Sequence, residues 1–197
     1  MRSSVTFGVV VLGVLAASCA EVPQPEIEAA RQAIASAREA GASEYAPSAL
    51  TAAEGELQKL DAELKAQSEK FALTRSYEEA TKIAQAAREA GDNAQTEATH
   101  NKELVRQEAL TLIEEVKTEL TEVKELVENA PKGKGTEEDI AALKSDVASM
   151  ETQLAEADQA LSSGSYAQAK SRAGAVREAA SRVRSEILMA MQAKRRT

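Results

Sequence analysis

Few side chains of this 197-residue chain could carry out covalent or acid–base chemistry, because it has one cysteine, one histidine and no tryptophan. Cys19 supplies the only thiol. A single cysteine cannot form a disulfide within its own chain, so this leftover thiol needs another explanation. Attachment of a lipid to the sulfur atom accounts for it, and Cys19 is therefore the first candidate functional residue.

The other reactive side chains follow no pattern typical of an active site. His100 stands beside Asn101 and Lys102 in a polar stretch, which favours a solvated surface histidine. Zinc sites need several Cys or His at set spacings, and Gly133–Thr136 lacks both the spacing and the preceding strand of a phosphate-binding loop. Carboxylates recur along a wet helix face rather than in a cleft. We therefore predict no catalytic residue, no metal, no cofactor and no enzymatic activity.

Residues 1–18 are expected to form an export signal. A basic start precedes an apolar run of about 13 residues, too short for a bilayer, which takes about 20. Such a run, ending in small residues, is typical of a secretory signal peptide. The residues directly before Cys19 are Leu15, Ala16, Ala17 and Ser18. They resemble the lipobox of bacterial lipoproteins, in which the cysteine is diacylated and becomes the new N-terminus. The alternative is an ordinary signal peptide cut after Ala20.

The residues that follow Cys19 bear on location. Ala20 stands where lipoproteins retained in the inner membrane of enteric bacteria typically carry Asp, so the resemblance implies an outer-membrane lipoprotein that faces the periplasm of the cell envelope. Its membrane partner would be reached through acyl chains, palmitate among them, on Cys19. Residues 19–25 form the lipidated tether, which Pro23 and Pro25 keep extended.

The composition predicts an all-α fold. Hydrophobic residues make up 43% of the chain but aromatic residues only 3%, which excludes a sandwich or barrel. Strong helix formers fill nearly every stretch between breakers. We expect elongated antiparallel helical hairpins, or a coiled-coil-like bundle, after the cleaved signal peptide. A hairpin domain would span residues 26–98, and a second helical region 99–197 would contain a loop at 131–136.

Within these regions, apolar spacing predicts the helix faces. The second helix is expected to run to about Thr74, with an apolar seam from Leu50 to Phe71 that Gln67 interrupts. Gly91 either ends the third helix or only kinks it. A heptad seam is expected near the end of the chain: Leu143, Val147, Met150, Leu154, Ala157 and Leu161.

An internal repeat links the two regions. Eight of fifteen residues are identical between the segments beginning at Ser76 and Ser165, including Tyr77 and Ala80 in the first and Tyr166 and Ala169 in the second. Each copy follows a leucine-rich helix. The repeated unit resembles the second half of a tetratricopeptide hairpin, in which a tyrosine covers the end of the hairpin and alanine admits a close partner helix.

A second resemblance covers residues 26 to about 98. An Ala-rich helix leads into Gly41-Ala42-x-x-Tyr45-Ala46-Pro47, which is followed by a leucine-rich helix and the Tyr77 hairpin. This order resembles an uncharacterised family of bacterial lipoproteins. Gly41, Tyr45 and Pro47 carry its turn motif. The resemblance implies an envelope location and no known activity.

Charge is divided unevenly along the chain. Residues 170–197 hold eight basic and two acidic side chains, although the whole chain has a net charge of −8. We expect the final helix to pack on acidic neighbours such as Glu114, Glu115, Glu119, Asp146 or Glu151, with its last basic residues suiting a helix C-terminus. The alternative is a patch for an anionic surface at Lys194, Arg195 and Arg196. Nucleic acid is excluded as a partner because the chain is acidic and poor in stacking aromatics.

Together these observations predict a membrane-anchored, non-catalytic helical scaffold or spacer of the bacterial envelope. Two alternatives stay open. One is a binding module for an envelope protein, a peptide or a cell-wall polymer. The other is an accessory subunit of an envelope enzyme. A large exposed apolar patch would favour binding, whereas helix seams that cover one another would favour a spacer.

Overall fold

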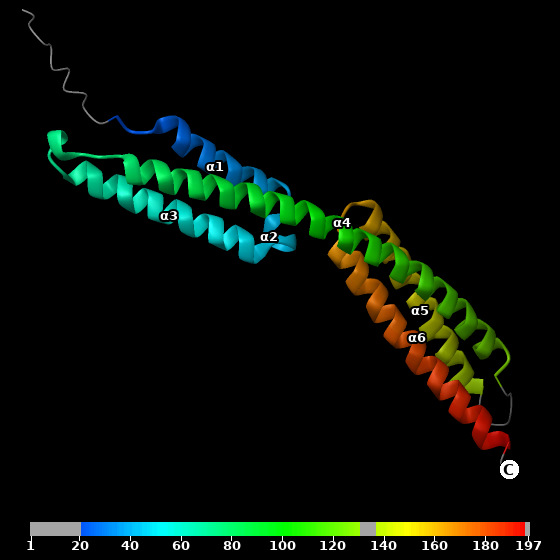
Figure 1. Ribbon diagram of the computed structural model, residues 1–197. Coiled ribbons are helices and arrows are strands. Elements are labelled where there is room, and N and C mark those ends of the chain that lie inside the picture. The colour runs from blue at the N-terminus through cyan, green and yellow to red at the C-terminus, as the bar shows by residue number, and fades with distance from the viewer. Residues whose placement is uncertain (1–20, 131–136, 196–197) are drawn as a thin grey trace, which may run out of the picture. The chain divides into compact units, whose positions relative to one another are not determined.

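The structure of the chain is a computed structural model that describes residues 21–130 and 137–195. Over these residues the chain contains helices and turns and no strand, which confirms the predicted all-α fold (Figure 1). In chain order the elements are α1 (Gln24–Glu39), α2 (Ala42–Tyr45), α3 (Pro47–Glu69), the 3-10 turn η1 (Ala72–Thr74), α4 (Glu78–Glu128), α5 (Glu137–Ser162) and α6 (Tyr166–Arg195).

The described chain divides into two compact units. Unit 1 comprises the residues up to Ala37 together with Ser48–Ala94, and unit 2 comprises Arg38–Pro47 together with the residues from Gln95 onward. The division within α4 falls close to the boundary expected at residue 98. The segment 38–47, which contains α2, belongs to unit 2 although it connects two helices of unit 1.

Unit 1 is a bundle of α1, α3 and the first part of α4, with α3 antiparallel to the other two (Figure 1). Alanine dominates the buried faces of α1 and of the first part of α4, which lets these two helices approach closely, whereas α3 buries larger side chains. Arg31 of α1 pairs with Asp61 of α3 at 3.0 Å. The buried residues are Ile27, Ala30, Ala33, Ile34 and Ala37 of α1, Leu50, Ala53 and Leu60 of α3, and Ala80, Ala84, Ala87 and Ala94 of α4.

Gly91 neither ends α4 nor marks its boundary, because the helix continues without interruption to Glu128. The glycine is buried against α1. A Cβ atom at Gly91 would lie 2.9 Å from the backbone of Ala33 and from the backbone nitrogen of Ile34. The residue is therefore glycine because two helix backbones meet there, and not because the chain turns.

The end of α3 differs from the prediction. The helix ends at Glu69 rather than near Thr74, and Phe71 is not part of its seam but 72% exposed. Gln67, predicted to interrupt the seam, is only 5% exposed. Its burial is compensated, because its amide donates to Glu63 at 2.7 Å and its amide oxygen accepts a hydrogen bond from the backbone N–H of Ser76 at 3.1 Å.

Unit 2 is built on α5, α6 and the second part of α4, whose buried residues alternate in steps of three and four. This spacing is the heptad pattern of coiled coils and confirms the predicted heptad seam of α5. On α4, Ala109 and Ile113 are buried, whereas Val105 and Leu112 are only half-buried. The core contains Ala109, Ile113, Val116, Leu120, Val123 and Val127 of α4, Val147, Met150, Leu154 and Ala157 of α5, and Ala169, Ala173, Val176, Ala180, Val183 and Ile187 of α6.

Candidate functional site

Two of the predicted sites lie outside the described residues. They are the lipidation site, with Cys19 and its lipobox residues Leu15, Ala16, Ala17 and Ser18, and the basic group at the chain end, with the side chains of Lys194, Arg195 and Arg196. The described chain begins at Glu21, two residues after Cys19.

The turn motif surrounds a buried tyrosine. Gly41 adopts a φ of 88°, which favours glycine. A Cβ atom at Gly41 would also lie 3.2 Å from the Tyr45 ring, so the glycine leaves room for the ring as well. Tyr45 ends α2 and is buried. Pro47 begins α3, where the missing N–H of proline has no helical partner to lose.

Tyr45 joins three segments of unit 2. Its backbone carbonyl accepts a hydrogen bond from Asn101 Nδ2 at 2.7 Å, and Lys102 Nζ stands 6.0 Å from the centre of its ring. Burial raises the pKa of the phenol above its ordinary value of 10.0, the charge of Glu44 raises it further, and a hydrogen bond with the backbone of Ala167 opposes the rise. The motif thus holds α2 against α4 and the start of α6.

The repeated tyrosines occupy corresponding places in the two units. Tyr77 precedes α4 and is buried in a cluster with Ile27 and Leu60. Tyr166 begins α6 and is half-buried. The alanines three residues later, Ala80 and Ala169, are both fully buried. The alanine positions are therefore equally enclosed, whereas the second tyrosine ring is wetter than the first.

A ladder of three ion pairs connects α4 and α6. Lys170 pairs with Glu108 at 2.8 Å, Arg177 with Glu115 at 4.0 Å and Arg184 with Glu122 at 3.4 Å. On both helices the paired residues are seven apart, and every pair is separated by 62 positions in the sequence. Charged residues that flank a heptad core set the register and orientation of helices in this way. We call these six residues the α4–α6 ladder.

Most of the carboxylates that form ion pairs with α6 differ from those expected. Only Glu115 is among the five named from the sequence. Glu114 instead binds Lys117 of its own helix, and Glu151 binds Lys124 of α4. Glu108 and Glu122 were missed, although their spacing of seven from Glu115 is visible in the sequence.

Helix α5 carries acidic residues that pair with both of its neighbours. Asp158 binds Lys117 of α4 at 3.2 Å, and Glu156 binds Arg172 of α6. The hydrogen bonds with Glu114 and Asp158 hold the pKa of Lys117 above its ordinary value, although partial burial opposes the shift. Hydrogen bonding to Glu151 likewise raises the pKa of Lys124.

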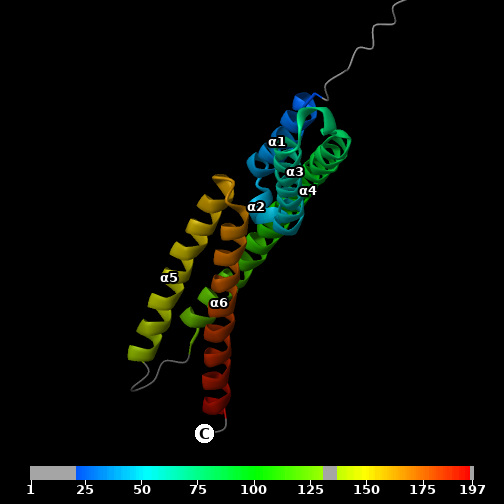
Figure 2. The ribbon, with the colours of Figure 1, turned by 90° about the vertical axis from the view of Figure 1, so that its left-hand side faces the viewer.

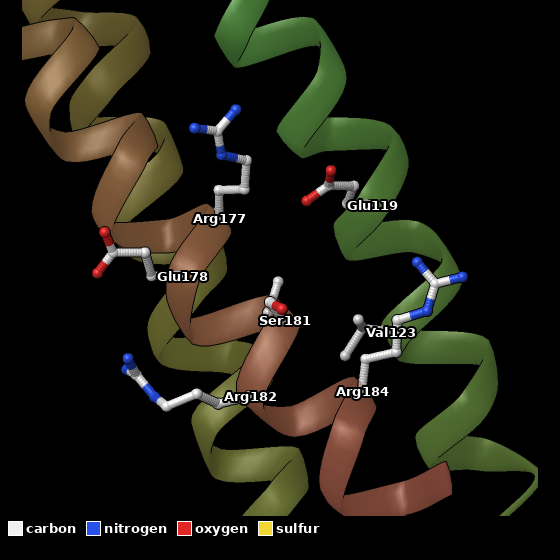
Figure 3. A pocket seen from close by; sticks show the side chains of 8 residues that line it. Glu119, Val123, Arg177, Glu178, Ser181, Arg182 and Arg184 are labelled. Carbon is white, nitrogen blue, oxygen red and sulfur yellow. The ribbon is translucent and has the colours of Figure 1, made fainter.

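An open groove of about 530 Å³ runs along α4 and α6 beside this ladder. Its lining includes side chains of both charges, namely Arg177, Arg182 and Arg184 and the carboxylates Glu119 and Glu178. In Figure 3 the Arg184 side chain crosses from α6 to α4, whereas Arg182 and Glu178 point to the other side of α6. Two of the three arginines are already engaged by ladder carboxylates.

Other reactive groups are dispersed. His100 is exposed on α4, as expected for a surface histidine. Within residues 21–130 and 137–195, no group of three or more His, Cys, Asp or Glu side chains is placed to hold a metal ion. None of the helices that the structure describes combines the length and the apolar character needed to cross a membrane.

Comparison with known proteins returned no matching family model, no matching curated protein and no matching solved structure.

Proposed function

We propose that the chain is a bacterial envelope lipoprotein, anchored to the membrane through acyl chains on Cys19, that serves as a non-catalytic helical scaffold or spacer. Its mature form begins at Cys19 and is held at the periplasmic face of the outer membrane. The order of residues from Leu15 to Cys19 supports the anchor. The turn motif at Gly41, Tyr45 and Pro47 supports membership of the lipoprotein family described above.

The observation that carries the scaffold proposal is that the apolar and charged side chains of unit 2 mainly contact one another. The heptad seams of α4, α5 and α6 cover one another, and four basic side chains of α6 are engaged by carboxylates of α4 and α5: Lys170, Arg172, Arg177 and Arg184. Among the described residues, no buried side-chain nitrogen or oxygen lacks a hydrogen-bond partner. A bundle that satisfies its own polar groups in this way is suited to holding a shape.

The anchor is tested by fractionation of cells that produce the wild-type chain or Cys19→Ser. The wild type should be processed and should partition into the detergent phase, whereas Cys19→Ser should be unprocessed or soluble. A second variant, Ser18→Ala, keeps a small residue before the cysteine and should behave as the wild type. Unchanged processing and partitioning of Cys19→Ser would overturn the anchor.

The scaffold is weighed against the alternative of a binding module for a cell-wall polymer by a salt series on isolated sacculi. The test variant replaces Lys194, Arg195 and Arg196 by Gln. The matched control removes the same charge from α6 by replacing Lys170, Arg177 and Arg184 by Gln. A scaffold predicts no salt-sensitive binding in any of the three proteins. Binding by the wild type that only the test variant loses would make the chain end a polymer-binding site.

A docked envelope protein, or an enzyme that the chain assists, is the remaining alternative. Crosslinking in intact envelopes, followed by purification through the C-terminus, identifies such a partner. The scaffold proposal predicts several neighbours at low yield. A single partner recovered in near-equal amount would favour the binding module or the accessory subunit instead.

A further inference from the structure

We propose that residues 70–75, which join α3 to α4 in unit 1, form a second membrane contact: Phe71 and Leu73 insert into the same bilayer surface that holds the lipid on Cys19, and Lys70 faces anionic headgroups. We call residues 70–75 the contact loop. This inference rests on the proposed lipid anchor for the identity of the bilayer, and the experiments below separate the two claims.

The contact loop exposes apolar side chains to an unusual degree for this chain. Phe71 and Leu73 are each 72% exposed, the largest values among the exposed large hydrophobic residues of the described chain. Phe71 is also one of only two phenylalanines in the sequence. Two large apolar side chains held in water at a loop tip are unfavourable unless another apolar phase covers them.

The loop is built to hold this conformation. The guanidinium of Arg75 donates to the backbone carbonyls of Lys70 at 3.0 Å and Ser68 at 2.9 Å. Thr74 Oγ1 donates to the Phe71 carbonyl at 2.8 Å. The buried amide of Gln67 accepts from the N–H of Ser76. Polar groups are therefore used to close the loop on its inner side, while Phe71 and Leu73 are left on the outside.

The contact loop lies at the end of unit 1 where the described chain begins. Val22 packs against the cluster that contains Ile27 and Tyr77, and Tyr77 directly follows the loop. Both views show the start of α1 beside the α3–α4 connection (Figures 1 and 2). Three peptide steps join Cys19 to Val22, at most about 11 Å when fully extended. Covalent geometry thus keeps a lipid on Cys19 close to the loop.

Charge and energy both fit a bilayer surface as the occupant. Lys70 directly precedes the apolar pair, and a basic side chain near an anionic membrane surface is attracted to it. The acyl chains on Cys19 would hold the chain at the bilayer, and an inserted Phe–Leu pair next to this anchor would fix the orientation of unit 1 on the membrane.

The first test uses a single tryptophan, which this chain otherwise lacks. The mature acylated chain carrying Phe71→Trp is reconstituted into vesicles of phosphatidylethanolamine and phosphatidylglycerol, with and without brominated acyl chains. The control is Ala52→Trp, an exposed site on α3 about 26 Å along the helix axis from Glu69, where α3 ends before the contact loop. We expect blue-shifted, bromine-quenched emission from Trp at 71 and water-like, unquenched emission from Trp at 52. Water-like emission at both positions would overturn the proposal.

The second test removes the lipid from the experiment. The mature chain from residue 19 carrying Cys19→Ser is floated with the same vesicles, as is the same chain with Phe71→Ser and Leu73→Ser. We expect the loop substitutions to reduce vesicle partitioning at least about tenfold. The matched control, Leu188→Ser with Met189→Ser, removes two exposed apolar side chains from α6 and should leave partitioning unchanged. An equal loss in the control, or no loss in the loop variant, would contradict insertion of the loop.

The two claims fail in different ways. If Cys19→Ser remains membrane-bound and processed in cells, the anchor is wrong, and the vesicle experiments still decide whether the loop inserts. If Cys19→Ser becomes soluble but Trp at 71 stays water-like, the anchor stands and the loop proposal is wrong. Stable association of Cys19→Ser chains with each other that Phe71→Ser abolishes, without vesicle binding, would assign the loop to a second copy instead.

Discussion

Replacing Gly91 by alanine tests how unit 1 is packed. An alanine within a helix is ordinarily favoured over glycine by about 1 kcal/mol. Here the added Cβ would meet the carbonyl carbon and Cβ of Ala33 and the nitrogen of Ile34, each at 2.9 Å. Carbon atoms in good contact stand about 3.5–4.0 Å apart. Because the atoms that are met belong mainly to the α1 backbone, α1 itself has to move.

The net effect follows from the two opposing terms. Overpacking a well-filled interface costs about 1–3 kcal/mol, which exceeds the gain in helix propensity. We therefore expect Gly91→Ala to lower the free energy of unfolding of unit 1 by up to about 2 kcal/mol. For a unit of this size, 1 kcal/mol corresponds to a change in Tm of about 4–8 °C.

Two further glycines provide matched controls. Gly55 within α3 and Gly174 within α6 have nothing within 4 Å of an added Cβ. Gly55→Ala and Gly174→Ala should therefore raise stability by up to about 1 kcal/mol through helix propensity alone. The assay is urea and thermal unfolding followed by circular dichroism. Stabilisation by Gly91→Ala equal to that of the controls would refute the close approach of α1 and α4.

Three other outcomes are expected. Arg184→Glu should weaken unit 2, and adding Glu122→Arg should restore its stability. The coupling energy of the pair should be at most about 1 kcal/mol, because the pair is exposed, and should shrink in high salt. A coupling energy of zero in this double-mutant cycle would contradict a stabilising role for the ladder. Tyr77→Ala should cost about 2–4 kcal/mol in urea unfolding and the half-buried Tyr166→Ala less, and the reverse order would contradict the difference in burial. Folding favours the neutral phenol of Tyr45, because its pKa is raised in the folded chain. The resulting contribution to folding stability is present below pH 10 and is lost as pH rises through the folded pKa. Absorbance titration should show one late-ionising tyrosine that Tyr45→Phe removes.

The helices and their inner faces were predictable because each depends on local spacing. Apolar steps of three and four from Val147 to Ala157 place those residues on one face whatever the neighbours are. Leu64 and Phe71 are also seven apart, but the same rule failed for Phe71 because α3 has already ended. Spacing does not record where a helix stops when neither glycine nor proline marks the end.

Features that depend on contacts between distant segments were not predictable. Gln67 can be buried because its amide oxygen accepts a hydrogen bond from the N–H of Ser76. Ser76 lies beyond a loop, so local spacing does not reveal this partner. Glycine often breaks a helix, but Gly91 lies within α4, where the close approach of the α1 backbone leaves no room for a Cβ atom. The charges of α6 were expected to meet carboxylates, yet which carboxylates they meet is fixed by the register of the packed cores, and this register is visible only once α4 and α6 lie side by side.

Whether Cys19 becomes a lipidated N-terminus is measured by the mass of the intact protein purified from membranes. We expect a chain that begins at Cys19 and carries the added mass of acyl chains, and we expect the Cys19→Ser protein to lack this species. An unmodified chain that begins at Glu21, as cleavage after Ala20 would produce, would contradict it.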